Sequence, residues 1–280
     1  MLQYKYLIVA VCLILPLPVV AQETAPDLYE QMAALPWQSY PAVGEIGGTS
    51  EIKLDGDLLF LGPQHSKKFL KLNGNPEWDG AHTIMPTSGL RFAILSYEDS
   101  GHVKDDDKID AASLLSTLKE QNRAGQEERR KLGYDALVLD DWAIPPHYDE
   151  TSHRLEWGTR IHVEGTDEQV VNYTARLLGR TGLTSAVLVT DAESLTQSVN
   201  EFHAALAGFS YNSGQTYGEY KQGDKLAEYG LVALIAGGAA AVATKSGFLK
   251  TFGIAIVAGL AAIGGAVTTF FRKLFRKKSS

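Results

Sequence analysis

The sequence predicts an α+β domain, an antiparallel sheet with flanking helices, followed by a C-terminal transmembrane helix segment. Three observations support this prediction. Segments with a period of two are joined by short glycine turns, segments with a helical period lie between them, and an uncharged stretch near the end precedes a basic cluster. Runs of strands joined by short turns, with helices between the runs, are typical of α+β domains.

Residues 1–21 have the pattern of a secretory signal peptide. Lys5 provides the positive start, residues 6–15 are apolar, and Val19-Val20-Ala21 places small residues at a cleavage site. An uncleaved N-terminal anchor is the alternative. Cleavage after residue 21 would leave residues 22–224 as an exported domain in the periplasm.

Cys12 is the single cysteine, and it lies inside the predicted signal. A mature chain without cysteine has no disulfide, no thiol nucleophile and no thiolate metal ligand. The exported domain must therefore gain its stability from a packed core, for which about 200 residues suffice.

The first part of the domain is predicted to alternate between strands and one short helix. Residues 49–61 are predicted to form strands joined by the hairpin turn Asp55-Gly56-Asp57, and residues 67–73 have a helical pattern. Residues 90–97 form the next strand. Residues 23–42 are polar and punctuated by prolines, which indicates the N-terminal lead-in of the mature chain.

The acidic run Asp105-Asp106-Asp107 precedes a predicted helix. Asp110 is a suitable N-cap for this helix. The apolar residues Leu114, Leu115 and Leu118 share one face of the helix. A calcium loop is the alternative, but such a loop places its oxygen ligands at alternate positions around a glycine turn. The sequence therefore favours a solvated loop that caps a helix.

The middle of the domain contains the clearest strand. Residues 142–149 are predicted to form a proline-stiffened turn, and residues 153–164 a strand with one buried and one wet face. Residues 170–178 and 183–190 form further strands, and a helix capped by Asp191 follows. Its apolar face is predicted to contain Leu195, Val199, Phe202 and Leu206.

Charge divides the chain into two parts. Residues 22–224 contain 17 Lys and Arg against 32 Asp and Glu, whereas the rest of the chain is basic and brings the net charge of the whole to −7. A domain this acidic is a poor partner for nucleic acid or an anionic lipid surface. The sequence thus predicts no nucleic-acid partner.

Residues 251–271 are uncharged and long enough to span a bilayer, and residues 272–280 form a basic tail. By the positive-inside rule the tail lies in the cytoplasm, and one crossing of the bacterial inner membrane is preferred. Two crossings, with residues 229–243 as a further span, are the alternative. Residues 225–250 are then an interfacial or hairpin helix. Small residues at a spacing of four would permit a homo-oligomer through this span, although they are also common in any span. These residues are Ala255, Gly259, Ala261 and Gly265.

No motif of a known reaction occurs. The sequence lacks a nucleophile elbow, a Ser-x-x-Lys motif, a phosphate loop and a dinucleotide fingerprint. His153 and His162 fall on opposite faces of the predicted strand, so one metal ion does not easily collect both. We therefore predict no cofactor and no metal.

The order of motifs resembles the DUF2167 family of predicted membrane-anchored bacterial proteins. The resemblance rests on the segments 97–110, 142–149, 153–157, 178–182 and 224–231, and His102 stands where a tyrosine is expected. It implies an exported domain with a C-terminal anchor and no established activity. The architecture also resembles sheet-and-helix domains of the PsbP kind.

Three functional hypotheses remain open. The first is a non-enzymatic envelope binding module whose contact loop contains Trp142, Pro145, Pro146, His147 and Tyr148. The second is an envelope polymer hydrolase, whose candidate catalytic residues are His147, Asp149, Glu156 and Asp141. In the third, the membrane segments are the functional part.

Overall fold

The computed structural model describes residues 28–73, 75, 77–87, 92–131, 136–166 and 169–237. The predicted signal at 1–21, the predicted span at 251–271 with its small residues and the basic tail at 272–280 lie outside these ranges. Within the described part of the chain, no helix has both the length and the apolar character needed to cross a membrane.

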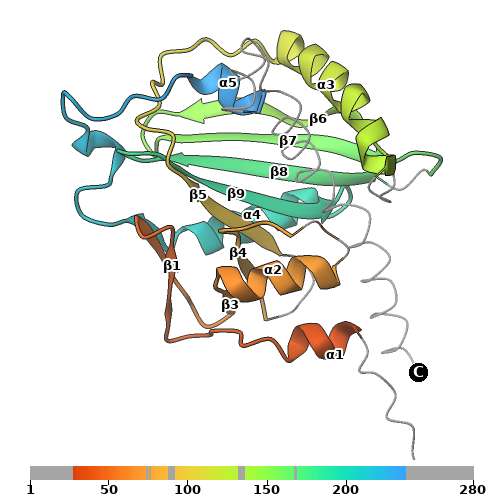
Figure 1. Ribbon diagram of the computed structural model, residues 1–280, viewed down its shortest axis with the longest axis horizontal. Coiled ribbons are helices and arrows are strands. Elements are labelled where there is room, and N and C mark those ends of the chain that lie inside the picture. Colours follow the sequence, from red (N-terminus) through yellow and green to blue (C-terminus); the bar gives the residue numbers. More distant parts are fainter. Residues whose placement is uncertain are drawn as a thin grey trace, which may run out of the picture.

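A seven-stranded sheet forms the centre of the molecule (Figure 1). Every neighbouring pair of its strands is antiparallel, which confirms the predicted α+β class. The strands lie in the order β3-β4-β5-β9-β8-β7-β6. Their bounds are β3 Leu58–Leu61, β4 His82–Pro86, β5 Ala93–Glu98, β6 Leu137–Asp149, β7 Arg154–Val163, β8 Gln169–Leu178 and β9 Leu183–Asp191.

Strand β7 shows why the alternating pattern was informative. Leu155 and Trp157 are buried under helices on one face, whereas Arg154 and Arg160 on the other face are partly exposed. Side chains along a strand alternate between the two faces of the sheet, so this pattern fixes the register of β7. Glu156 departs from it, because it belongs to the wet set yet is only 3% exposed.

A second sheet of three strands lies on one face of the large sheet. It contains β1 Val43–Ile46, β2 Ser50–Lys53 and β10 Phe209–Tyr211 in the order β1-β2-β10. β2 and β3 belong to different sheets. The turn at Asp55 was expected to join them as paired strands. The turn is present, but β2 pairs with β1 and β10, and β3 pairs with β4.

Helices cover both faces of the large sheet (Figure 1). α4 packs on the same face as the small sheet, because Phe202 shares a core cluster with Ile46 and Ile52. The other helices lie on the opposite face, where they bury two further clusters around Phe69 and Leu155. The helices are α1 Leu28–Ala33, α2 Pro63–Leu72, α3 Ala111–Lys131, α4 Leu195–Leu206 and α5 Leu231–Ile235.

The caps of α3 and α4 test two sequence predictions. Asp110 accepts hydrogen bonds from the backbone nitrogens of Ala112 and Ser113 at 3.1 Å, so its predicted role as the cap of α3 is confirmed. α4 begins three residues later than predicted, after Ser194. Asp191 accepts a hydrogen bond from the Ser194 nitrogen and so supports the turn that precedes the helix.

Residues 142–149 form the second half of strand β6, so the prediction of a turn was wrong. β6 is an edge strand of thirteen residues, and its register shifts between Ile144 and His147, where Pro145 and Pro146 lie. Proline has no backbone N–H to donate and is therefore tolerated on an edge strand or at a bulge. The two prolines thus mark an irregular edge strand, and a sequence alone does not easily distinguish such a strand from a turn.

The segment after α4 returns to the sheet and packs against the acidic loop 99–110. Arg180 binds both carboxylate oxygens of Asp224 at 2.7 and 2.8 Å, and the His102 backbone pairs with Lys225 and Ala227. α5 then buries Leu231, Leu234 and Ile235 in the cluster around Leu155. Residues 225–236 therefore contribute to the core of the domain in this structure.

Candidate functional site

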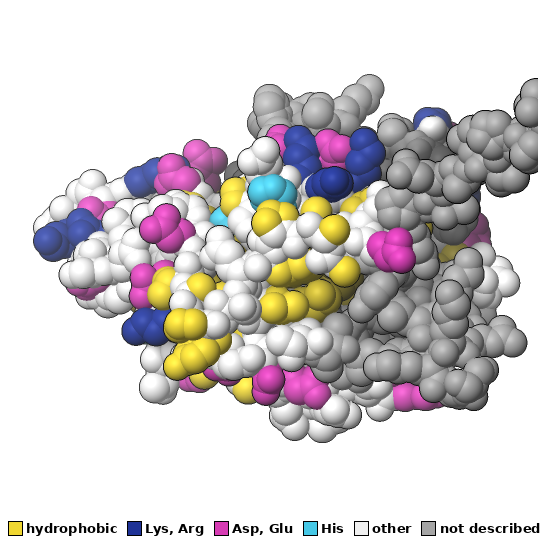
Figure 2. Space-filling view, turned by 90° about the horizontal axis from the view of Figure 1, so that it is seen from below, with side chains coloured by type: hydrophobic (Ala, Val, Ile, Leu, Met, Phe, Trp, Pro, Cys, Tyr) yellow, Lys and Arg dark blue, Asp and Glu magenta, His cyan; other side chains and the backbone are white. Residues whose placement is uncertain are grey.

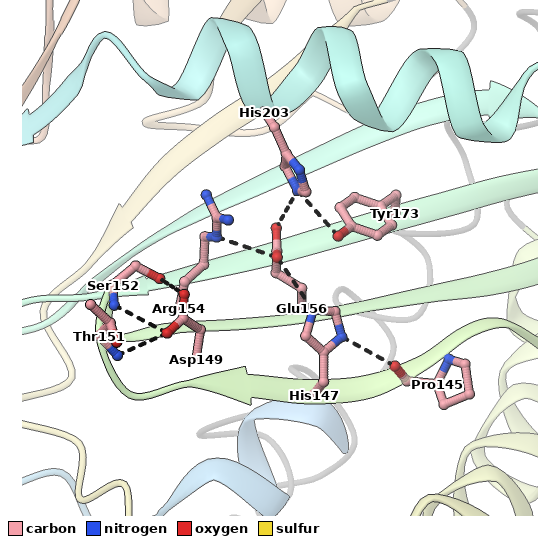
Figure 3. A network of polar contacts seen from close by, with 9 residues as sticks. All are labelled: Pro145, His147, Asp149, Thr151, Ser152, Arg154, Glu156, Tyr173 and His203. Carbon is pink, nitrogen blue, oxygen red and sulfur yellow. Dashed lines mark hydrogen bonds and ion pairs between the residues drawn. The ribbon is translucent and has the colours of Figure 1, made fainter.

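The polar side chains of β6, β7 and β8 meet the end of α4 on one face of the sheet (Figure 3). Glu156 on β7 lies opposite His147 on β6 and Ala175 on β8. His203 from the last turn of α4 points down toward Glu156, and Tyr173 from β8 lies beside it. Three adjacent strands and one helix therefore build a single polar cluster.

Glu156 is the centre of this cluster. Its Oε1 accepts a hydrogen bond from His203 Nε2 at 2.8 Å. Its Oε2 lies 3.3 Å from Arg154 Nε and 3.5 Å from His147 Nε2. The carboxylate side chain is only 4% exposed, whereas that of His147 is 53% exposed. A buried carboxylate needs such partners, because burying its charge without them costs on the order of several kcal/mol.

Tyr173 on strand β8 completes the cluster. Its hydroxyl lies 3.3 Å from His203 Nε2, and its ring packs edge-on against Phe202. Burial, followed by the negative charge of Glu156, raises the pKa of the Tyr173 hydroxyl well above its ordinary value of 10.0. Tyr173 therefore stays protonated and remains a neutral hydrogen-bonding group.

The structure brings together two of the four predicted catalytic residues. His147 and Glu156 face each other across β6 and β7, as described above. Asp149 is bound to its own turn, where it accepts hydrogen bonds from the Thr151 nitrogen at 2.8 Å and the Ser152 hydroxyl at 2.8 Å. These bonds, led by that from Ser152, lower the pKa of the Asp149 carboxyl group.

Asp141 also interacts with its own backbone. Its Oδ1 accepts a hydrogen bond from the Trp142 nitrogen at 2.7 Å, and the residue is exposed opposite Arg160. The hydrogen bonds of Asp141 and Asp149 go to their own neighbours in the chain, whereas the ion pairs of Glu156 go to His147, Arg154 and His203. The four candidates consequently form one pair, His147 with Glu156, and two separate structural carboxylates.

The predicted contact residues point to both faces of the sheet. Trp142 donates from Nε1 to the Ala111 carbonyl at 2.9 Å and so fastens the start of α3. Tyr148 donates to Asp105 Oδ2 at 2.8 Å and lies 3.1 Å from His153 Nδ1. On this strand, Pro145 and His147 are exposed and Pro146 is partly exposed. Trp142 and Tyr148 thus hold the fold together on the helical side.

His203, Arg154 and Tyr173 are site residues that the sequence did not indicate as such. Arg154 forms its ion pair with Glu156 along the same strand. His203 is separated from Glu156 by 47 positions along the chain. Only the packing of α4 across the sheet brings them together, so no local spacing could have revealed the contact.

Metal binding depends on three or more suitable side chains close together. Among the residues that the structure describes, no group of three His, Cys, Asp or Glu side chains could hold a metal ion. Both carboxylate oxygens of Glu156 already face basic side chains. The prediction that the protein needs no metal or cofactor stays a prediction.

The fold and the site together define the class of protein. It is an α+β domain with an antiparallel sheet and a polar cluster on one open face. The chain belongs to the DUF2167 family, described as "Protein of unknown function (DUF2167)", which matches residues 39–268. This result confirms the resemblance inferred from the ordered motifs. A search of the curated proteins found no match.

Among solved structures, the chain is similar to the cyanobacterial PsbP protein (CyanoP) from Synechocystis sp. PCC 6803, determined in solution. The two are 10% identical, with a TM-score of 0.37. The alignment covers 63% of this chain and 92% of the other.

Proposed function

We propose that this protein is a membrane-anchored binding module of the bacterial envelope that recognises another envelope protein or peptide. The surface that we propose for recognition is the polar face of β6 and β7. The observation that carries the proposal is the cluster around Glu156, in which exposed His147 and partly exposed His203 and Arg154 are held in place by one buried carboxylate. Side chains that are already fixed lose little conformational entropy when a partner binds.

The chemistry of the cluster favours binding over turnover. Hydrolysis of a glycosidic polymer needs one carboxylic acid and one carboxylate placed about 5–10 Å apart on either side of the substrate. Asp141 and Asp149 are each committed to neighbouring backbone groups, and Glu156 is surrounded by basic side chains. A hydrolase that uses His147 and Glu156 as its acid–base pair is the alternative.

The proposed location of the module rests on sequence predictions. The predicted signal at residues 1–21 and the predicted single span at 251–271 support a domain in the periplasm, with residues 272–280 in the cytoplasm. A reporter that is active only in the cytoplasm, fused after Ser280, should then be active. Silence of this fusion would contradict the single crossing.

Photo-crosslinking in living cells tests the proposed surface. A photoreactive amino acid at Asp141 or Pro145, both exposed on β6, should capture a defined partner from the envelope. The matched control is the same amino acid at Glu120, which is exposed on α3. Equal capture from Glu120 and from β6 would argue against recognition by this surface.

Two substitutions separate binding from catalysis. His147→Ala should weaken capture of the partner, whereas Asp149→Ala, which removes only a turn acceptor, should leave capture nearly unchanged. Circular dichroism of both variants confirms that the domain is folded. A turnover activity that disappears in folded His147→Ala would replace the binding module with the hydrolase.

A further inference from the structure

The loop 99–110 and the segment 217–227 lie side by side at one end of the large sheet (Figure 1). Their backbones meet at His102. Its nitrogen donates a hydrogen bond to the Lys225 carbonyl at 2.8 Å, and its carbonyl accepts one from the Ala227 nitrogen at 2.9 Å. The segment continues into α5, so this contact also determines how firmly the chain before α5 is attached to the domain.

The imidazole ring of His102 stacks on two tyrosine rings of the same segment. The centroid of the ring lies 4.3 Å from that of Tyr217 and 4.3 Å from that of Tyr220. His153, the residue before β7, packs on Tyr217 with a centroid distance of 4.2 Å. Four rings therefore join the loop, the segment and the start of β7.

His102 is almost completely removed from water. The residue is 8% exposed, and its Nδ1 has no hydrogen-bond partner within the part of the chain that the structure describes. Figure 2 shows, in contrast, histidine at the molecular surface. An imidazolium ring carries a proton on both nitrogens, so protonation of His102 would create a buried charge and a buried donor without an acceptor.

The groups around His102 act on its protonation in opposite directions. Burial is the largest effect and lowers the pKa of His102 below its ordinary value of 6.5. The carboxylates of Asp105 and Asp224 and the backbone of Arg180 and Gly179 act against burial and favour the charged ring. The Arg180 guanidinium, which binds Asp224 at 2.7 and 2.8 Å, offsets the charge of one of these carboxylates.

We propose that this ring stack is an acid-sensitive latch, which holds the segment 217–227 on the loop 99–110 at neutral pH and releases it when His102 is protonated. The latch goes beyond the recognition surface of β6 and β7, because it controls the attachment of a different part of the chain. Since the closed form disfavours the proton, closing is strongest above pH 6.5 and weakens as the pH falls below this value. One proton changes the closing equilibrium by at most about tenfold per pH unit.

Hydrogen exchange of the full chain in detergent micelles tests the latch, with the Ala227 amide as the reporter. Protection factors, which correct for the intrinsic effect of pH on exchange, are measured from about pH 7.5 to about pH 5. Protection of Ala227 should fall at least about threefold below pH 6.5, whereas the amides of the central strand β9 should keep theirs. An equal loss in β9 would indicate acid unfolding of the whole domain, for which the buried His82 is another source, and would overturn a local latch.

Two variants identify the group that takes up the proton. His102→Phe keeps a planar ring beside the tyrosines but cannot be protonated, so its Ala227 protection should stay constant over the same pH range. His153→Asn is the matched control, because it removes the other imidazole of the stack and asparagine tolerates the φ of 50° at this position. It should keep the full pH dependence. A dependence that persists in His102→Phe, or disappears in His153→Asn, would overturn the assignment to His102.

Protonation of His102 can also be observed directly, which keeps the latch testable if His102→Phe does not fold. The imidazole Cε1 signal of His102 in the wild-type chain should titrate with a midpoint below pH 6.5. Protection of Ala227 should decline between pH 6.5 and that midpoint. A midpoint above pH 6.5 would mean that the tyrosine rings and carboxylates stabilise the charged ring, and would overturn the proposal.

Discussion

At the scale of single residues, Glu156 explains how a sheet face that was predicted to be wet can hold an ordered site. A lone carboxylate in this position would need water, but Arg154 and His203 replace the solvent around it. The same contacts fix the orientation of both basic side chains. Glu156 is therefore a positioning residue, and its removal should affect stability and recognition together.

Replacing Glu156 by Gln should destabilise the domain by about 2 kcal/mol, because a buried charged acceptor with basic partners becomes neutral. Urea unfolding followed by circular dichroism measures the change. The control is Glu164→Gln, which breaks an exposed ion pair with Arg130 and should cost less than about 1 kcal/mol. Equal losses in the two variants would contradict the central role of Glu156.

The ion pair between Arg180 and Asp224 predicts a dependence on pH. Hydrogen bonds from the Arg180 guanidinium and then from the Lys221 nitrogen lower the pKa of the Asp224 carboxyl group from 3.8 to about 2. Since the folded state favours the ionised form, the pair stabilises the domain above pH 3.8. This stabilisation should disappear as the pH falls toward 2.

Unfolding free energies of the wild-type chain and Asp224→Asn test this dependence. The wild type should be more stable than the variant near neutral pH, and the gap should close between pH 3.8 and about 2. The control is the variant Asp79→Asn, which loses an exposed ion pair with Lys67. Its unfolding free energy is compared with that of Asp224→Asn over the same pH range. A gap that stays constant over this range would contradict the assignment.

At the scale of elements, α3 protects the exposed edge of β6. The Asn122 side chain donates to the Leu137 carbonyl at 2.8 Å and accepts from the Leu139 nitrogen at 3.1 Å. The amide thus imitates the hydrogen bonds of a neighbouring strand. Edge strands with free backbone groups invite pairing with other chains, so this contact also limits aggregation.

Asn122→Ala should therefore destabilise the domain by about 1–3 kcal/mol, because the Leu139 nitrogen loses the Asn122 oxygen as its acceptor and the Leu137 carbonyl keeps only the longer bond from Gln126 at 3.4 Å. Hydrogen exchange at the Leu139 amide should increase in the same variant. Asn200→Ala, which alters an exposed position of α4, is the control and should change neither quantity. Unaltered exchange at Leu139 would mean that Asn122 does not protect the strand.

The elements differ in how far the sequence predicts them, and the reasons are physical. β7, β8, β9 and α4 were predictable because each has one buried and one open side, or a buried run between glycine turns. β1, β4 and β10 were not predicted, because these strands of three to five residues have no turn signal beside them that marks them. β2 and β3 are equally short, but the turn at Asp55-Gly56-Asp57 indicated them. The cluster around Glu156 was only half predicted, since the contribution of His203 depends on long-range packing.

At the scale of the whole molecule, the C-terminal part of the domain connects two regions of different character. The acidic domain ends in α5, and an apolar stretch with a basic tail follows in the sequence. Asp107 accepts a hydrogen bond from the Val232 nitrogen at 3.0 Å and so caps α5. The acidic loop therefore attaches α5 to the core of the domain. In the sequence, α5 leads toward the predicted span.

This arrangement predicts where the domain can be cut. A chain that ends at Gly237 should unfold cooperatively, because it retains Leu231, Leu234 and Ile235 in the core. A chain that ends at Asp224, the predicted boundary of the exported domain, should be less stable by at least about 3 kcal/mol, since each buried apolar side chain contributes about 1.5–3 kcal/mol. Thermal and urea unfolding of the two proteins measure the difference. Asp107→Ala in the longer chain should produce part of the same loss. Equal stability of the two chains would mean that α5 belongs to the membrane segment and not to the domain.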